Sequence, residues 1–139
     1  MPASPATGRA LERVRRLCLA LPETSEMTAW GHPVFKAGKK TFVAFEPIKG
    51  RHSIAFRLEA VDVDLLSSQG AFFETPYGRG LWASAWADAR LDWALVANLV
   101  ERSYRIVAQK RMLSVLDGTR PETEAAAAKR WRAVTRTIG

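Results

Sequence analysis

The chain has 139 residues, 47% of them hydrophobic and 25% charged, which is typical of one globular domain and excludes a disordered, collagen-like or coiled-coil protein. Its 21 basic and 14 acidic side chains give a net charge of +7, so either a polyanionic partner or simple solubility explains the composition. The sequence lacks an apolar run of the roughly 20 residues that span a bilayer, lacks a hydrophobic signal core near its start and has a single cysteine, so we expect a soluble cytoplasmic protein with no membrane association.

An amphipathic helix is predicted near the start of the sequence, with Thr7 as its N-cap. Apolar residues between Leu11 and Leu21 recur at helical spacing, and arginines lie on the opposite face. Cys18 belongs to the apolar stripe, so we interpret it as a small buried hydrophobic residue rather than a catalytic thiol. Pro22 ends the helix, and the segment LPETSEMTAWGHP is expected to form an irregular loop.

Three consecutive antiparallel strands are predicted next, in the segments PVFKA, TFVAFE and HSIAFRL. Gly38 supplies the first turn, and PIKG at 47–50 supplies the second. In the third strand, Ile54 and Phe56 alternate with Ala55 and Arg57, which indicates a sheet with one covered face.

The second half of the sequence predicts more helix than strand. We expect a short helix from about 59 to 68, a loop over AFFETPYGRG, a strand over LWASAW and a long helix from 91 to 113 packed across the sheet. A separate amphipathic helix anchored by Trp131 is expected after Gly118. The predicted fold is therefore α+β, with an antiparallel sheet and helices on one face over residues 1–116, and a C-terminal helical extension over residues 117–139.

Motifs for catalysis and metal binding are weak in this sequence. His32 and His52 have no second histidine or cysteine at ligand spacing, so we predict no metal site and no cofactor. Patterns for phosphate loops, dinucleotide binding, hydrolase elbows and zinc proteases are also missing from the sequence. A general base formed by His32 with Glu23 or Glu26 is the one enzymatic alternative, and we assign no catalytic residue.

Basic residues cluster instead at the two predicted hairpin turns, and they are Lys36, Lys39, Lys40, Lys49 and Arg51. Successive turns lie at opposite ends of a sheet, about 20 Å apart for strands of about six residues. Such turns cannot surround one small anion, but they can contact an extended polyanion such as duplex DNA at two places. Trp82 and Trp86 share one face of their strand, where tryptophan is more often a core residue than a platform for base stacking.

Five segments occur in a characteristic order: LPETSE at 21–26, WGHPVFKAGKKTFVAFE at 30–46, IAFRLEA at 54–60, GLWASAW at 80–86 and LVERSYRIVAQK at 99–110. This ordered set resembles the MmcQ/YjbR family of small bacterial proteins over about residues 21–112. The resemblance implies a fold of helix, three antiparallel strands, helix, two strands and helix, similar to type III secretion chaperones. It also implies a DNA-binding protein of the kind described as double-wing.

The family's residues correspond to particular positions of this chain. The hairpin Gly-Lys pair corresponds to Gly38 with Lys39 or Lys40, and the Ser-Tyr pair to Ser103 and Tyr104. The tryptophan of the family corresponds to Trp82. Many members have a lysine or histidine just before this tryptophan, whereas this chain has Arg79, Gly80 and Leu81, so a contact there rests on Arg79 alone.

The function expected from the sequence is non-enzymatic, sequence-tolerant DNA binding. Its expected contacts are Lys36, Lys39, Lys40, Lys49, Arg51, Arg79 and Trp82. Five neutralised phosphates would give a slope of roughly −4 to −5 for log K against log salt. The alternative is a chaperone-like module that binds a protein partner on the sheet face carrying Trp82 and Trp86.

Overall fold

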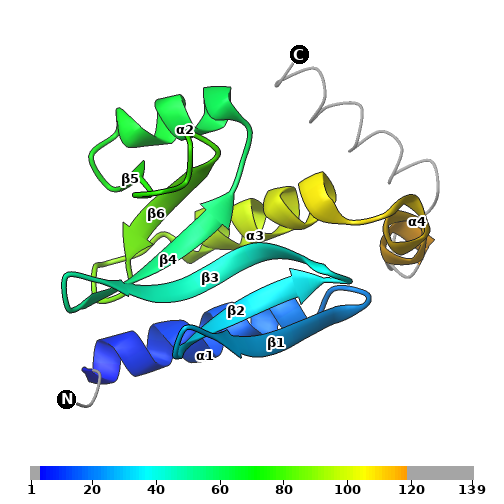
Figure 1. Ribbon diagram of the computed structural model, residues 1–139, viewed down its shortest axis with the longest axis horizontal. Coiled ribbons are helices and arrows are strands. Elements are labelled where there is room, and N and C mark those ends of the chain that lie inside the picture. Colours follow the sequence, from blue (N-terminus) through cyan, green and yellow to red (C-terminus); the bar gives the residue numbers. More distant parts are fainter. Residues whose placement is uncertain (1–3, 119–139) are drawn as a thin grey trace.

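In a computed structural model, residues 4–118 form four helices and a six-stranded antiparallel sheet (Figure 1). The strand order is β1-β2-β3-β4-β6-β5, and the predicted α+β fold is confirmed. The elements in chain order are α1 (Pro5–Leu19), β1 (Thr24–Ala29), β2 (His32–Ala37), β3 (Lys40–Ile48), β4 (Arg51–Arg57), α2 (Ala60–Ser67), β5 (Phe73–Glu74), β6 (Trp82–Trp86), α3 (Trp93–Val107) and α4 (Lys110–Gly118).

Helix α1 begins earlier than the sequence predicted. Its N-cap is Ser4, whose Oγ accepts a hydrogen bond from the Thr7 backbone N–H at 3.1 Å. Thr7 was wrongly predicted as the cap; it is buried in the first turn, because the Ser4-Pro5 pair combines a capping hydroxyl with the fixed φ of proline at the first helical position. Cys18 is fully buried, as its place in the apolar stripe predicted.

Strand β1 occupies the segment that was predicted, wrongly, to be an irregular loop. It pairs along its whole length with β2 and forms the edge of the sheet. Its sequence is polar because its side toward α1 is stabilised by an ion pair: Arg15 donates to both carboxylate oxygens of Glu26, at 2.6 and 2.9 Å. These hydrogen bonds hold the pKa of Glu26 below its usual range. A strand held in this way carries no alternation of apolar residues for sequence analysis to detect.

Strands β2, β3 and β4 form the predicted pair of hairpins, and β3 extends over nine residues. One face of the sheet packs against α1 and α3 in the main core, to which β4 contributes Ile54 and Phe56 and β6 contributes Ala83 and Ala85 (Figure 1). Helix α2 packs beside β5 and β6 and adds buried apolar side chains to the same core.

The opposite side of the sheet has its own small cluster, formed by Val34, Ala44 and Ala55 with Ala29 and Trp82 against them. All five residues lie in strands, and no helix between residues 4 and 118 contributes to the cluster. We call this side, with the two half-buried tryptophans of β6 that project from it, the open face.

The long helix predicted from 91 to 113 is two helices, so that prediction was wrong in its length. Asp92 caps α3 by accepting from the N–H groups of Ala94 and Leu95. The helix ends at Ala108, whose backbone is extended (φ −69°, ψ 146°). After the break, α4 buries Met112 beside the β2–β3 turn.

Two further sequence predictions concern the loop before β6 and the end of the chain. The segment predicted as a loop over AFFETPYGRG contains the two-residue strand β5. The predicted C-terminal helix with Trp131 lies outside the described residues. Of the helices within residues 4–118, none combines the length and apolarity that crossing a bilayer requires.

Candidate functional site

The β2–β3 turn presents two of the predicted lysines to solvent. Lys39 and Lys40 are exposed, and neither pairs with a carboxylate of residues 4–118. Lys36 is half-buried on β2, on the same side as Val34 of the open face. The turn is held to the start of β1, because the Gly38 N–H donates to the Glu23 carbonyl at 3.1 Å.

Replacing Gly38 by alanine is expected to lower the free energy of unfolding by more than the roughly 1–2 kcal/mol that a left-handed backbone alone costs. Gly38 has a φ of +61°, and a Cβ added there would lie 2.8 Å from Met112 Cε, which is buried. Gly50→Ala is a matched control, since Gly50 also has a positive φ (+81°) but open space around it. Urea unfolding of both variants tests this; equal losses would show that the contact with Met112 contributes nothing.

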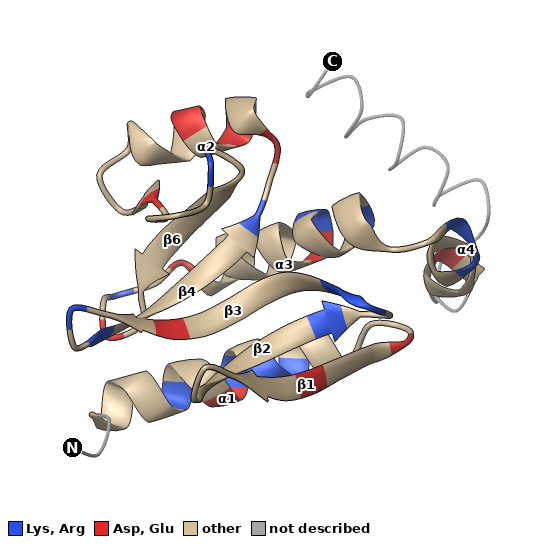
Figure 2. Ribbon diagram, in the orientation of Figure 1, with Lys and Arg blue, Asp and Glu red and all other residues tan. Residues whose placement is uncertain are grey.

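The β3–β4 turn carries Lys49 at the other end of the same strand (Figure 2). Lys49 and Gly50 have φ values of +51° and +81°, as a two-residue hairpin turn requires. Lys49 is exposed and has no carboxylate partner within the described part of the chain. The nine residues of β3 separate the two turns by about 27 Å at 3.4 Å per residue. The predicted placement of basic turns at opposite ends is therefore present, with a longer span.

Arg51 is held differently from the lysines. Its Nη2 donates to Asp88 Oδ1 at 2.7 Å, its Nε to the same oxygen at 3.0 Å, and its guanidinium lies 4.4 Å from the ring centroid of Trp86. The hydrogen bonds from Arg51 lower the pKa of the Asp88 carboxyl. Arg51 thus joins the β3–β4 hairpin to the loop after β6, and its charge is already neutralised.

Arg79 lies in the β5–β6 loop, at the same end of the sheet as the first turn. Strands β3 and β6 run in the same direction with β4 between them, so both strands start at that end. Arg79 is exposed with a φ of +54°. A buried hydrogen bond of 2.6 Å between the hydroxyls of Thr75 and Ser84 fixes the base of the loop. Lys39, Lys40 and Arg79 are therefore grouped at one end of the sheet, and Lys49 lies at the other.

Both tryptophans of β6 are half-buried on the open face. Trp82 packs on the cluster of Val34, Ala44 and Ala55, and Trp86 contacts Phe73 with a centroid separation of 4.7 Å. The helix-facing positions of this strand are alanines, so the larger side chains of β6 lie away from the main core.

His32 is paired with a carboxylate other than the two suggested by the sequence. Its Nε2 lies 3.7 Å from Glu46 Oε2 across the β2–β3 pair, and its ring stacks on exposed Trp30. Glu26 instead binds Arg15, and Glu23 binds Arg111. Between residues 4 and 118, no group of three histidine, cysteine, aspartate or glutamate side chains is close enough to hold a metal ion.

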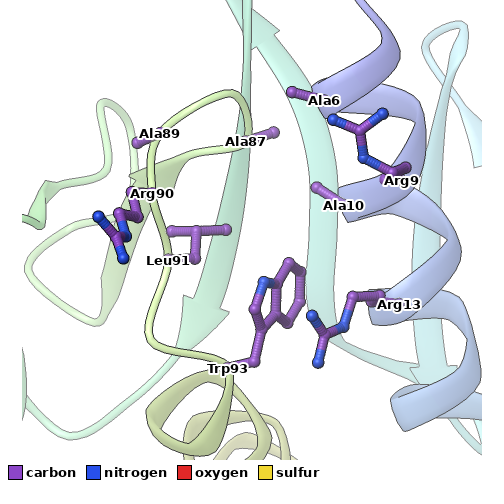
Figure 3. A pocket seen from close by; sticks show the side chains of 9 residues that line it. All are labelled: Ala6, Arg9, Ala10, Arg13, Ala87, Ala89, Arg90, Leu91 and Trp93. Atoms are coloured by element: carbon purple, nitrogen blue, oxygen red, sulfur yellow. The ribbon is translucent and has the colours of Figure 1, made fainter.

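A hollow of about 250 Å³ lies between α1 and the loop that joins β6 to α3, and sequence analysis missed it (Figure 3). It is lined by Ala6, Arg9, Ala10, Arg13, Ala87, Ala89, Arg90, Leu91 and Trp93. The spacing of Arg9 and Arg13 by one helical turn is the only sequence signal for it, since Arg90 comes from a distant part of the chain.

Comparisons with known proteins bear on the fold of the chain. The YjbR family model matches residues 19–106, which is more than half of the chain. Among solved structures, protein DR2400 of Deinococcus radiodurans, with a DUF419 domain of the same family, is similar with a TM-score of 0.64. The two sequences are 16% identical over 82% of this chain and 91% of that chain, so the similarity shows the fold alone. No curated protein matches the sequence.

Proposed function

The chain belongs to the YjbR family, and we propose that it is a non-enzymatic protein that binds duplex DNA through phosphate contacts. The observation that carries the proposal is the exposure of Lys39, Lys40 and Lys49 at the two ends of the sheet, where none of them pairs with a carboxylate of residues 4–118. Arg79 extends the group at one end. Lys36 and Trp82 project from the open face between the turns and would contact the sugars there.

The spacing of the basic turns supports an extended ligand. A span of about 27 Å corresponds to about eight base pairs at 3.4 Å per base pair, so the two turns would contact phosphates well separated along a duplex. Because Arg51 is paired with Asp88, we count four phosphate contacts rather than five. The four residues are Lys39, Lys40, Lys49 and Arg79. The expected slope of log K against log salt is then about −3.6.

Removing one lysine from each turn, in the double variant Lys40→Gln and Lys49→Gln, is expected to reduce that slope by about 1.8. Fluorescence anisotropy with a hydroxyl-ended duplex of 20 base pairs, titrated across a range of salt concentrations, measures it. The matched control is Arg16→Gln with Arg102→Gln, which removes the same charge from α1 and α3 on the helical side of the sheet. The proposal fails if wild-type protein does not bind at low salt, or if the control pair lowers the slope as much as the turn pair.

A second candidate function, docking of a protein partner on the open face, is favoured by the incomplete burial of Trp82 and Trp86. An aromatic strand face of this kind provides apolar contact rather than charge neutralisation. The same salt titration separates the two functions, because phosphate contacts weaken steeply with salt and apolar contacts do not.

A further inference from the structure

We propose that the hollow between α1 and the β6–α3 loop binds a phosphate monoester. Neither the basic turns nor the open face contributes a residue to it. Two of its three arginines, Arg9 and Arg13, precede the segment matched by the family model, so the site depends on residues outside the family match.

The first argument is uncompensated positive charge. Within residues 4–118, none of Arg9, Arg13 and Arg90 is paired with a carboxylate. The acidic residues of the adjacent loop are engaged elsewhere, since Asp88 binds Arg51 and Asp92 caps α3. Arg9 and Arg13 lie one helical turn apart and repel each other, and a dianion that accepts hydrogen bonds from both guanidinium groups would relieve that repulsion.

The second argument is the orientation of the side chains. The Arg13 guanidinium lies 4.3 Å from the ring centroid of Trp93, a stacking contact that restrains it and leaves its edge N–H groups available for a ligand. Figure 3 shows Arg9 and Arg13 extending from α1 toward the loop, while the exposed Arg90 guanidinium lies on the outer side of the loop. Arg9 and Arg13 are therefore the primary anion contacts, and Arg90 closes on the ligand by a change of rotamer.

The third argument is the apolar lining. Four alanines and Leu91 form most of the rest of the wall, and their small side chains leave the volume open. A volume of 250 Å³ equals about eight water molecules of liquid, which accommodates a phosphate group together with a small organic part. The charge selects the phosphate, and the alanine wall contacts the organic part. Such a group is present both in small phosphorylated metabolites and at the phosphorylated 5′ end of a DNA strand.

The test combines two ligands with charge and shape variants. Glycerol 3-phosphate is titrated by calorimetry, with glycerol as the uncharged comparison, and the indole N–H resonances of ¹⁵N-labelled protein are followed by NMR. The chain has five tryptophans, and Trp93→Phe identifies the resonance that must move. In parallel, a duplex with 5′-phosphate ends is compared with the same duplex with 5′-hydroxyl ends.

We expect the double variant Arg9→Gln with Arg90→Gln to weaken glycerol 3-phosphate binding at least tenfold. Arg16→Gln, on the same helix but outside the hollow, should change it less than twofold. Ala6→Phe keeps every charge but fills the hollow, and should also abolish binding. If the protein binds the 5′-phosphorylated duplex more tightly than the 5′-hydroxyl duplex, and the double arginine variant loses this difference, the phosphate comes from DNA ends. If the protein binds glycerol 3-phosphate but has equal affinity for the two duplexes, the ligand is a free metabolite.

The proposal is overturned if glycerol 3-phosphate at millimolar concentration neither releases heat nor shifts the Trp93 indole resonance. It is also overturned if Arg16→Gln weakens binding as much as the double variant, because the effect would then be one of net charge. Binding of the hydroxyl-ended duplex is a separate result, which tests the basic turns alone.

Discussion

Replacing Tyr104 by alanine is expected to lower the free energy of unfolding by about 3–5 kcal/mol, because the change removes a fully buried aromatic ring. The ring meets Phe42 of β3 edge to face, with centroids 5.7 Å apart. The hydroxyl donates to the Pro22 carbonyl at 2.8 Å, which connects α3 to the chain just before β1. One side chain thus joins the sheet, the helix that covers it and the start of the edge strand.

Tyr104→Phe separates the two contributions. It keeps the ring and removes only the hydrogen bond, so we expect a loss of about 1 kcal/mol. Urea unfolding followed by circular dichroism at pH 7 measures both variants, with the m-value as a check that the transition remains two-state. If the phenylalanine variant were as unstable as the alanine variant, the hydrogen bond to Pro22 and not the packing on Phe42 would be the dominant contribution.

Tyr104 belongs to the Ser-Tyr pair of the sequence resemblance. Ser103 and Tyr104 are both fully buried where α3 crosses the sheet, so their role in this chain is in the core. The sequence predicted that α3 packs on the sheet, because its apolar residues form a wide arc at the helical period. It could not show that the tyrosine hydroxyl reaches Pro22, a contact between residues 82 positions apart.

The elements that sequence analysis located correctly are those with a strong local signal. Gly38 and Gly50 mark turns that need a positive φ, and Ile54 and Phe56 alternate toward the core, so the β2–β3–β4 hairpins were predictable. The edge strand β1 has no such signal, because the partner that stabilises Glu26 lies on α1. The break between α3 and α4 at Ala108 also has no local sequence signal, since neither glycine nor proline marks it.

The candidate interface was predictable only in part, for the same reason. Lysines beside turn glycines are exposed in almost any hairpin, so the solvent-facing positions of Lys39, Lys40 and Lys49 follow from the local sequence. The pairing of Arg51 with Asp88 and the placement of Arg9 and Arg90 around one hollow require the assembled fold. Which arginines remain available to a ligand is therefore a tertiary property.

Raising the pH from about 8.5 to about 10 is expected to destabilise the protein by about 2 kcal/mol through Cys18 alone. Cys18 is fully buried, and burial, helped by the negative charge of Glu26, raises the pKa of its thiol far above the usual range. The folded state therefore keeps the thiol proton at a pH where the unfolded state has lost it. Stability is complete below the ordinary thiol pKa, and each further pH unit costs about 1.4 kcal/mol until the folded pKa is reached.

Cys18→Ala isolates this contribution, since alanine has no proton to lose. The variant is expected to be less stable at pH 7.5, because it leaves a small cavity among the apolar side chains that α1 packs against the sheet. Its stability should then change less than that of the wild type between pH 8.5 and 10, so the two curves of unfolding free energy against pH converge. Urea unfolding under reducing conditions at pH 7.5, 8.5, 9.25 and 10 provides those curves. Parallel curves would mean that the thiol ionises as easily in the folded protein as in the unfolded chain, and that the first helix opens enough to admit water to Cys18.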